Sequence, residues 1–247
     1  MIALIPSYMR CGKVRALDYA ERIADRVIMS TQTLEDYEAY SAEYGGRAKI
    51  VYWRASSAAG NRNTLLRELS AGERAIMLDD DVRRVNVCYG PKSRNVREAT
   101  REDIERCLDR MEDEGVAVGG FYPVNNPFFA FPRAEETRND ILIGAGMLFI
   151  ADGAMFDESY KACEDYALVL KKVADGETVM RFNRFLVETV EDSMSAALAG
   201  ETSGGLADAY AGGEHAEAIR RLAAEYWPIA KLGCNGTSIQ IDKRYVS

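Results

Sequence analysis

The sequence predicts an α/β fold in which a mostly parallel central sheet carries helices on both faces within a single domain, residues 1–247. Short apolar runs alternate with helix-like segments through about the first 80 residues, a pattern typical of right-handed βαβ units. The runs are apolar without alternation, as expected of strands buried on both faces. A chain that is 47% hydrophobic can bury such a core without disulfides or metal staples.

Four strands are expected in the first part of the chain, at residues 2–5, 26–29, 49–53 and 75–78. Helices are expected between them. The first covers residues 13–25, and the second begins at Thr33 and ends at Gly45. The third is expected to be capped by Asn61 or Asn63 and closed by Gly72. Ligands of such sheets bind beyond the carboxyl ends of the strands, so we expect residues 1–115 to form a nucleotide-binding half.

The remaining residues, 116–247, are expected to form an acceptor-binding half. Apolar residues at i, i+3, i+4 and i+7 predict a helix over 100–114. Strands are predicted at 116–123, 141–150 and 180–187, and an aromatic loop or edge strand at 125–132, where prolines bracket the segment. Glu164 and Asp165 open a further helix, residues 199–213 read as a loop, and a last helix covers 214–227.

Composition excludes several classes of protein. A net charge of −8 argues against a general nucleic-acid coat protein. Five scattered cysteines without a CxxC pair argue against a zinc site or a disulfide framework and favour a reducing, cytoplasmic location. No signal peptide is recognised, and no apolar run approaches the length of about 18 residues that a membrane span requires.

The most informative stretch is the apolar strand that runs directly into Asp79-Asp80-Asp81. Three adjacent like charges repel one another, and a divalent cation with a preference for oxygen ligands, Mn²⁺ or Mg²⁺, would neutralise them. Because side chains alternate along a strand, Asp79 and Asp81 are expected to lie on one face and Asp80 on the other. The alternative is an acidic turn that only closes the strand.

Three features in this order resemble the GT-A glycosyltransferases, in particular the family-2-like members. They are the strand ending in Pro6-Ser7, the Arg62-Asn63 pair taken as the start of a helix, and the strand ending in Asp79-Asp80-Asp81. The resemblance covers about residues 1–170. It implies a Rossmann-like GT-A fold and metal-dependent transfer of a sugar from a nucleotide sugar, expected to be UDP-linked, to an acceptor hydroxyl.

The resemblance also implies roles for individual residues. Pro6, Ser7 and Arg10 would contact the base or the diphosphate, and Arg62 would lie near the nucleotide. The ribose would be contacted by Asp79 or Asp80. The metal would be bound by Asp81, with Asp79 and the single histidine, His215, as further ligands. A surface histidine at a helix start is the alternative for His215.

The pair Glu164-Asp165 supplies the expected catalytic carboxylates. By the same resemblance Asp165 is the general base that takes a proton from the acceptor hydroxyl, and Glu164 is its neighbour. Simple capping of the helix N-terminus is the alternative. Gly146 is expected either to let the acceptor approach the backbone or to satisfy tight packing.

A basic segment follows the aspartate triplet. Between residues 82 and 101, six basic residues face a single acid, although the whole chain is acidic. This segment, with Arg94, and the exposed aromatic run containing Phe129 favour a nucleic-acid acceptor. The opening residues 5–10 and the small size are similar to phage glycosyltransferases associated with TET/JBP oxygenases. This similarity implies 5-hydroxymethylcytosine in DNA as the acceptor.

Two other classes remain open on the sequence. A phosphatase of the haloacid dehalogenase type also has an apolar strand ending in Asp-x-Asp, although that strand is usually the first of its domain. A non-catalytic GT-A-like module that binds nucleic acid or protein is the second alternative, and the intact aspartate triplet and Glu164-Asp165 pair argue against it.

Overall fold

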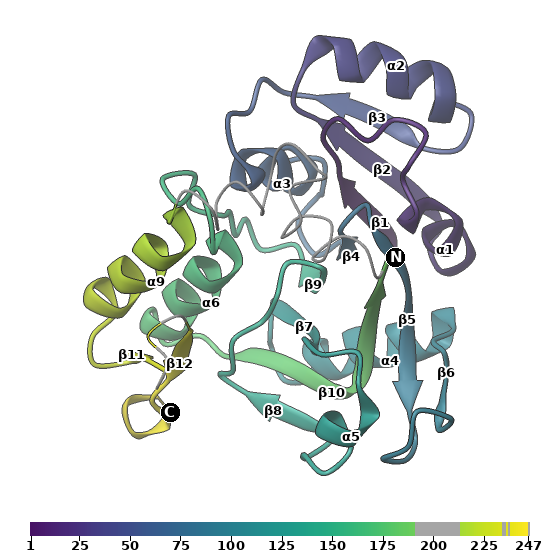
Figure 1. Ribbon diagram of the computed structural model, residues 1–247. Coiled ribbons are helices and arrows are strands. Elements are labelled where there is room, and N and C mark those ends of the chain that lie inside the picture. The colour runs from purple at the N-terminus through teal and green to yellow at the C-terminus, as the bar shows by residue number, and fades with distance from the viewer. Residues whose placement is uncertain (191–212, 234–235, 237, 247) are drawn as a thin grey trace.

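The computed structural model describes residues 1–190, 213–233, 236 and 238–246 (Figure 1). The strands are β1 (Ile2–Pro6), β2 (Arg26–Thr31), β3 (Lys49–Tyr52), β4 (Arg74–Leu78), β5 (Val82–Cys88), β6 (Val96–Glu98), β7 (Val118–Tyr122), β8 (Glu136–Arg138), β9 (Gly146–Ile150), β10 (Val179–Thr189), β11 (Ala230–Leu232) and β12 (Ile239–Ile241). The helices are α1 (Ala16–Ile23), α2 (Leu34–Tyr44), α3 (Ala58–Leu66), α4 (Arg101–Asp113), α5 (Pro127–Ala130), α6 (Glu164–Ala174), α9 (Glu214–Glu225) and the short 3₁₀ helix η1 (Lys243–Tyr245).

One ten-stranded sheet organises the molecule, in the order β3-β2-β1-β4-β9-β7-β10-β5-β6, with β8 paired to β10. The strands β3, β2, β1 and β4 are parallel, as the alternation of strands and helices predicted. Beyond β4, the neighbouring strand β9 is antiparallel, and β10 pairs in parallel with β7 and antiparallel with β5. The separate pair β11-β12 lies beside α9 (Figure 1).

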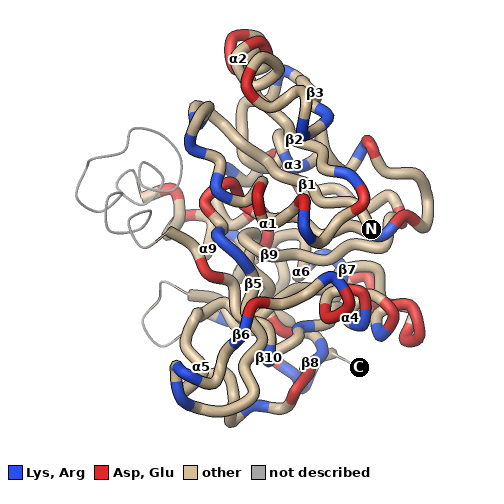
Figure 2. The backbone as a smooth tube through the Cα atoms, turned by 90° about the vertical axis from the view of Figure 1, so that its right-hand side faces the viewer, with Lys and Arg blue, Asp and Glu red and all other residues tan. Residues whose placement is uncertain are grey.

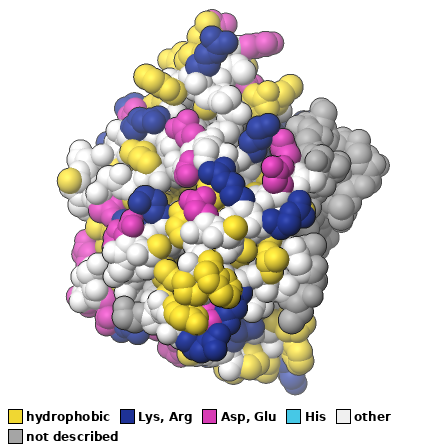
Figure 3. Space-filling model, turned by 90° about the vertical axis from the view of Figure 1, so that its left-hand side faces the viewer, with side chains coloured by type: hydrophobic (Ala, Val, Ile, Leu, Met, Phe, Trp, Pro, Cys, Tyr) yellow, Lys and Arg dark blue, Asp and Glu magenta, His cyan; other side chains and the backbone are white. Residues whose placement is uncertain are grey.

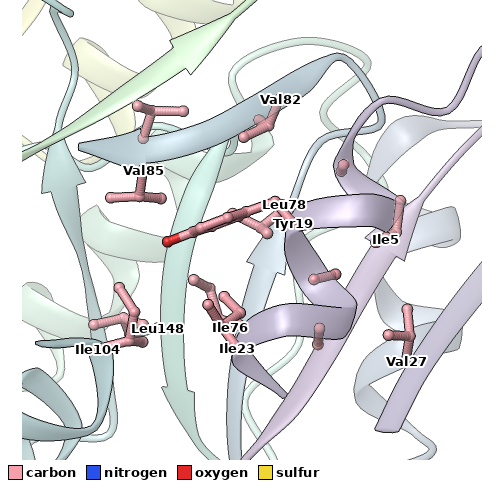
Figure 4. Close-up of a cluster of buried hydrophobic side chains, with 14 of the residues drawn as sticks. Ile5, Tyr19, Ile23, Val27, Ile76, Leu78, Val82, Val85, Ile104 and Leu148 are labelled. Carbon is pink, nitrogen blue, oxygen red and sulfur yellow. The ribbon is translucent and has the colours of Figure 1, made fainter. Parts of the chain in front are cut away.

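Helices cover both faces of the sheet, as predicted. On one face α1, α2 and α4 bury side chains such as Tyr19, Tyr40 and Ile104 against alternate residues of β1, β4 and β5 (Figure 4). On the other face α3 and α6 pack on the remaining alternate residues, including Leu4 and Met77. Because both faces of β1 and β4 are covered, these strands are apolar throughout, which explains the continuous hydrophobic runs in the sequence.

Several helix boundaries follow from local capping. The Thr33 side chain accepts a hydrogen bond from the Asp36 N–H at the start of α2. Thr100 and Asp103 form a reciprocal capping box at the start of α4. The start of α3 differs from the prediction: Ser57 caps this helix, and Asn61 and Asn63 lie buried inside it. Their side chains bond to distant backbone groups instead of capping.

The second half holds the other differences. The basic segment after the triplet, for which no strand was predicted, forms two strands, β5 and β6. The aromatic run expected as a loop or edge strand forms the short helix α5, with Pro127 in its first turn. The strand expected over 141–150 begins only at Gly146. The loop expected over 199–213 lies, except for Gly213, outside the described residues.

The helix α9 joins α6 and the β11-β12 pair in a smaller apolar cluster that contains Leu170, Ile219 and Leu222. Hydrophobic side chains also gather on the surface of this side of the molecule (Figure 3). Within the described ranges, no helix combines the length and the apolar character that a membrane span requires.

Candidate active site

The aspartate triplet lies where β4 ends and the chain turns into β5. The strand itself stops at Leu78, and the Val82 N–H donates to the Asp79 carbonyl to close a turn. The Asp80 carbonyl accepts from Arg15 at the start of α1, and the Asp81 carbonyl accepts from Val190 after β10. Strand alternation therefore does not apply to the triplet, and the expectation that Asp79 and Asp81 share a face loses its basis.

Asp80 is buried against the end of β1. The Ser7 hydroxyl donates to Asp80 Oδ2 at 2.5 Å, and Ser7 Oγ also lies 2.8 Å from the Tyr40 hydroxyl oxygen. The guanidinium of Arg10 is 3.5 Å from Asp80 Oδ1. Three of the residues predicted to bind the nucleotide, Ser7, Arg10 and Asp80, are thus brought together, next to Pro6 at the end of β1.

Burial controls the protonation of Asp80. It raises the pKa of this carboxyl to about 7, and the charges of Asp79 and Asp81 act in the same direction. The hydrogen bond from Ser7 and the charge of Arg10 oppose the rise only in part. The site therefore holds a carboxyl that changes protonation near neutrality, as perturbed groups in functional sites often do.

Arg62 connects the triplet to the start of α6. Its side chain is only 8% exposed. Its Nη2 donates to Asp79 at 2.8 Å, its Nε to Glu164 at 3.1 Å and its Nη1 to the Gly144 carbonyl at 3.1 Å. A buried guanidinium with two carboxylate partners is geometrically fixed. Arg62 is therefore adjacent to the predicted site, and its charge is balanced by two carboxylates of the protein, Asp79 and Glu164.

Asp165 lies next to this cluster and is held by backbone groups. The Gly144 N–H donates to its Oδ2 at 2.7 Å, and the Tyr166 N–H donates to its Oδ1 at 2.8 Å. Gly144 thus contacts both Asp165, through its N–H, and Arg62, through its carbonyl. A Cβ on Gly144 would lie 2.5 Å from Arg62 Nη2, so only glycine fits at this position.

The pKa of Asp165 is raised to about 7. Burial is the largest cause and the charge of Glu164 the second, while Arg62 and the two backbone N–H groups favour the ionised form. A carboxyl with a pKa near neutrality can accept a proton at physiological pH and release it again. The arrangement can therefore perform general-base chemistry.

The remaining predicted residues lie on other elements, and of these Gly146 is next to the cluster, because it pairs with Leu78 at the end of β4. Arg94 is in the turn between β5 and β6, beyond the end of β5 that points away from the triplet, and Phe129 is on α5. His215 is in the first turn of α9. Gly146 is buried in the sheet, where a Cβ would lie 2.6 Å from Val187, which supports the packing alternative for this glycine.

Two residues of the site were not singled out from the sequence. Tyr40 accepts a hydrogen bond from the Arg10 N–H and contacts Ser7, so it orders the loop after β1. The Asn61 side chain donates to the Ser7 carbonyl at 3.1 Å. Tyr40 is on α2 and Asn61 is on α3, so both are far from Ser7 in the sequence. Their contacts with Ser7 therefore have no local sequence signal, and Asn61 was interpreted only as a helix cap.

The donors around the triplet suit a hard cation in one respect. The triplet supplies carboxylate oxygens, of which those of Asp79 and Asp80 also bond to Arg62 and Ser7. Mg²⁺ commonly binds one or two carboxylates and completes its shell with water and substrate phosphates. Among the described residues, no group of three or more His, Cys, Asp or Glu side chains is arranged to hold a metal by itself.

Comparison with solved structures identifies the fold. Residues 1–349 of S. aureus TarS superpose with a TM-score of 0.51 at 12% identity, and the same protein in complex with UDP superposes with a TM-score of 0.51 at 14% identity. Each match covers 91% of this chain but 64% of the TarS chain, so the protein spans less than two thirds of the structure that it resembles. The predicted GT-A fold is confirmed. No protein-family model and no curated protein matches the sequence.

Proposed function

We propose that the protein is a glycosyltransferase that moves a sugar from a nucleotide sugar, UDP-linked, to an acceptor hydroxyl. One observation carries the proposal: the buried Arg62 joins Asp79, at the end of β4, to Glu164, the neighbour of the half-buried Asp165. Asp79, which we expect to face the nucleotide sugar, and Glu164, the neighbour of the candidate base Asp165, are therefore held by the same guanidinium group. The likeness to TarS, which has been crystallised with UDP, supports a nucleotide donor.

In the proposed reaction Asp165 takes the proton of the acceptor hydroxyl. The freed oxygen attacks the anomeric carbon of the sugar, and the bond from that carbon to the diphosphate oxygen breaks, so that the nucleoside diphosphate leaves with the electron pair. Ser7, Arg10 and Asp80 would hold the nucleotide at the ends of β1 and β4. Asp81 would bind a Mn²⁺ or Mg²⁺ ion, which stabilises the charge that develops on the leaving diphosphate.

For the acceptor we propose a hydroxymethylated base, 5-hydroxymethylcytosine in DNA. The basic residues of β5 and β6, in a chain whose net charge is −8, support a polyanionic acceptor. The phosphatase alternative requires Asp79 as a nucleophile. This is not favoured, because the Asp79 carboxylate is bound to a buried arginine and the fold is of the GT-A type.

The test is a screen of UDP-linked and other sugar nucleotides with Mn²⁺, with and without DNA that contains 5-hydroxymethylcytosine. We expect turnover of a sugar nucleotide, stimulated by the modified DNA and abolished in Asp165→Asn. Asp113→Asn, an exposed acid at the end of α4, is the matched control and should keep full turnover. Absence of both binding and turnover for every sugar nucleotide would overturn the proposal. Turnover without any DNA stimulation would retain the transferase and exclude the DNA acceptor.

A further inference from the structure

A second recess lies at the opposite end of β5 from the triplet. It is a groove of about 600 Å³ between α4, the end of β5, the segment after α5 and the middle of β10. It shares no residue with the carboxylate cluster described above. Four arginines line it: Arg97, Arg106, Arg110 and Arg184. We call it the arginine groove.

The charges in the arginine groove are only partly neutralised by its own acids. The Asp103 carboxylate is bound by both Arg97 and Arg106, so that one negative charge serves two guanidinium groups. Arg110 pairs with Glu114 and Glu136 outside the groove. Glu135 is the only other acid in the lining. The side chain of Arg106 is 68% exposed, so a ligand can reach it.

Arg184 carries the clearest uncompensated charge. It donates to the carbonyls of Ala130 and Arg133 at 3.1 and 3.0 Å, and its guanidinium lies 4.6 Å from the centre of the Phe131 ring. No carboxylate of the described residues pairs with it at ion-pair distance. Two carbonyls and a ring face hold the planar group in place without cancelling its charge, which leaves it able to bind an anion.

An exposed aromatic ring stands beside these cations. Tyr89 lines the groove with 61% of its surface exposed. Its hydroxyl donates to the Arg94 carbonyl at 3.2 Å, which fixes the ring against the β5-β6 turn. Basic positions on β5, β6 and α4 lie on this side of the molecule (Figure 2). Exposed aromatic rings next to arginines form the surface that binds single-stranded nucleic acid by base stacking and phosphate contacts.

We propose that the arginine groove binds a single-stranded segment of nucleic acid. A base would stack on Tyr89, and the flanking phosphates would contact Arg184 and Arg106. Charge complementarity favours this occupant: the lining holds four arginines against two acids, Asp103 and Glu135, so it attracts a phosphodiester backbone although the whole chain carries a net charge of −8. The groove discriminates little between sequences, because stacking and phosphate contacts do not read base edges.

The position of the groove gives it a role in acceptor binding, an extension that rests on the proposed function. The strand β5 starts directly after Asp81 and leads into the groove at Cys88. Its 7 residues span about 23 Å at about 3.3 Å per residue. A strand stacked as in B-form DNA, with one phosphate per about 3.4 Å, would cover that length with about seven nucleotides, and an extended strand would need fewer. The groove would therefore hold the acceptor strand at a distance from the base that is modified.

The test is binding of a fluorescein-labelled 16-nucleotide oligothymidylate, followed by anisotropy at 50 mM salt in the absence of any sugar nucleotide. We expect Tyr89→Ala and Arg106→Glu each to weaken binding at least about fivefold. Arg184→Gln should weaken binding similarly and reduce the salt dependence by about 0.7 in the slope of log K against log salt. The control is Arg26→Ala, a half-exposed arginine at the start of β2, which should bind like the unchanged protein.

Thermal unfolding of each variant distinguishes a loss of binding from a loss of folding. If Arg184→Gln is unstable, the binding of Tyr89→Ala tests the proposal instead. The proposal is overturned if the oligonucleotide does not bind the unchanged protein, or if the groove variants bind it as tightly as Arg26→Ala does. Because no sugar nucleotide is present, a positive result stands even if the proposed glycosyl transfer fails, and a negative result leaves donor turnover untouched.

Discussion

The buried Asp80 and the half-buried Asp165 are both carboxyls whose pKa is raised to about 7, yet the protein holds them by different means. Asp80 bonds to side chains, the Ser7 hydroxyl and the Arg10 guanidinium. Asp165 bonds to backbone N–H groups of Gly144 and Tyr166. Backbone donors keep their positions when side chains move, whereas a side-chain network can rearrange around a ligand. The difference suits a fixed base at Asp165 and an adaptable contact to the donor at Asp80.

The largest effect should come from removing the fixed carboxyl. Asp165→Asn keeps the shape of the side chain but cannot accept the proton, so turnover should fall by about 10²–10⁴-fold with little change in donor affinity. Asp80→Asn should instead weaken the donor affinity more than the maximal rate. Steady-state kinetics with varied sugar nucleotide separates the two. If both variants lose maximal rate and donor affinity in the same proportion, Asp80 and Asp165 do not have the different roles proposed for them.

Arg62→Ala should be the most destabilising replacement. It leaves Asp79 and Glu164 without their buried partner, and breaking a buried ion pair on one side costs about 3–5 kcal/mol. Urea unfolding measures the loss. Arg47→Ala is the control, because its partners Asp18 and Glu21 are at the surface, and it should cost less than about 1 kcal/mol. Equal losses for the two variants would contradict the buried arrangement.

The pH dependence of turnover should report Asp165. The base acts only when it is ionised, and burial raises its pKa from 3.8 to about 7, so the acid limb of the profile moves upward with it. Turnover at saturating donor should fall about tenfold per pH unit below that value. A plateau that extends unchanged down to pH 5 would show that Asp165 is not the base.

Gly144→Ala tests the backbone that serves both clusters. The added Cβ would lie 2.5 Å from Arg62 Nη2 and must displace a fixed side chain, so we expect a loss of about 1–3 kcal/mol in unfolding free energy. Gly46→Ala, where no atom lies within 4 Å of the new Cβ, is the matched control. An unchanged free energy of unfolding in Gly144→Ala would mean that the Arg62 side chain can move aside without cost.

Ser7→Ala should have the smallest effect, about 1–2 kcal/mol, because it removes a hydrogen bond to the buried Asp80 and a contact of Tyr40. Tyr40→Phe provides the comparison, since it keeps the bond between Ser7 and Asp80. Urea unfolding of both variants ranks the two contacts. A larger loss of unfolding free energy in Tyr40→Phe than in Ser7→Ala would show that the tyrosine hydroxyl, rather than the serine hydroxyl, stabilises the loop after β1.

Local signals predicted much of the first half. Continuous apolar runs and the cap at Thr33 located β1 to β4 and α2, because these elements depend on neighbouring residues. The strands β5 and β6 escaped prediction, since two arginines separate Val82 from Val85 and the apolar residues of β5 do not alternate regularly. The helix α3 was placed too late because Asn61 and Asn63 resemble caps, while tertiary contacts hold both inside the helix.

For the candidate site, the sequence indicated which residues to consider, but it did not indicate which of them contact one another. The resemblance indicated Ser7, Asp80 and Asp165, which the structure places at strand and helix ends as expected. It did not indicate that Arg62 would bond to Asp79 and Glu164, because these residues are 17 and 102 positions away in the chain. Such long-range pairs leave no periodic signal in the sequence.

The Arg62 cluster also bears on how the molecule can assemble. A contact across 102 residues forms only after the chain between α3 and α6 has been organised, and long-range contacts of this kind slow folding. The β4-β9 pairing joins the same two parts of the chain. In a ribosome-bound chain that ends before Glu164, Arg62 could therefore pair with Asp79 but not with its second carboxylate partner, which has not yet been synthesised.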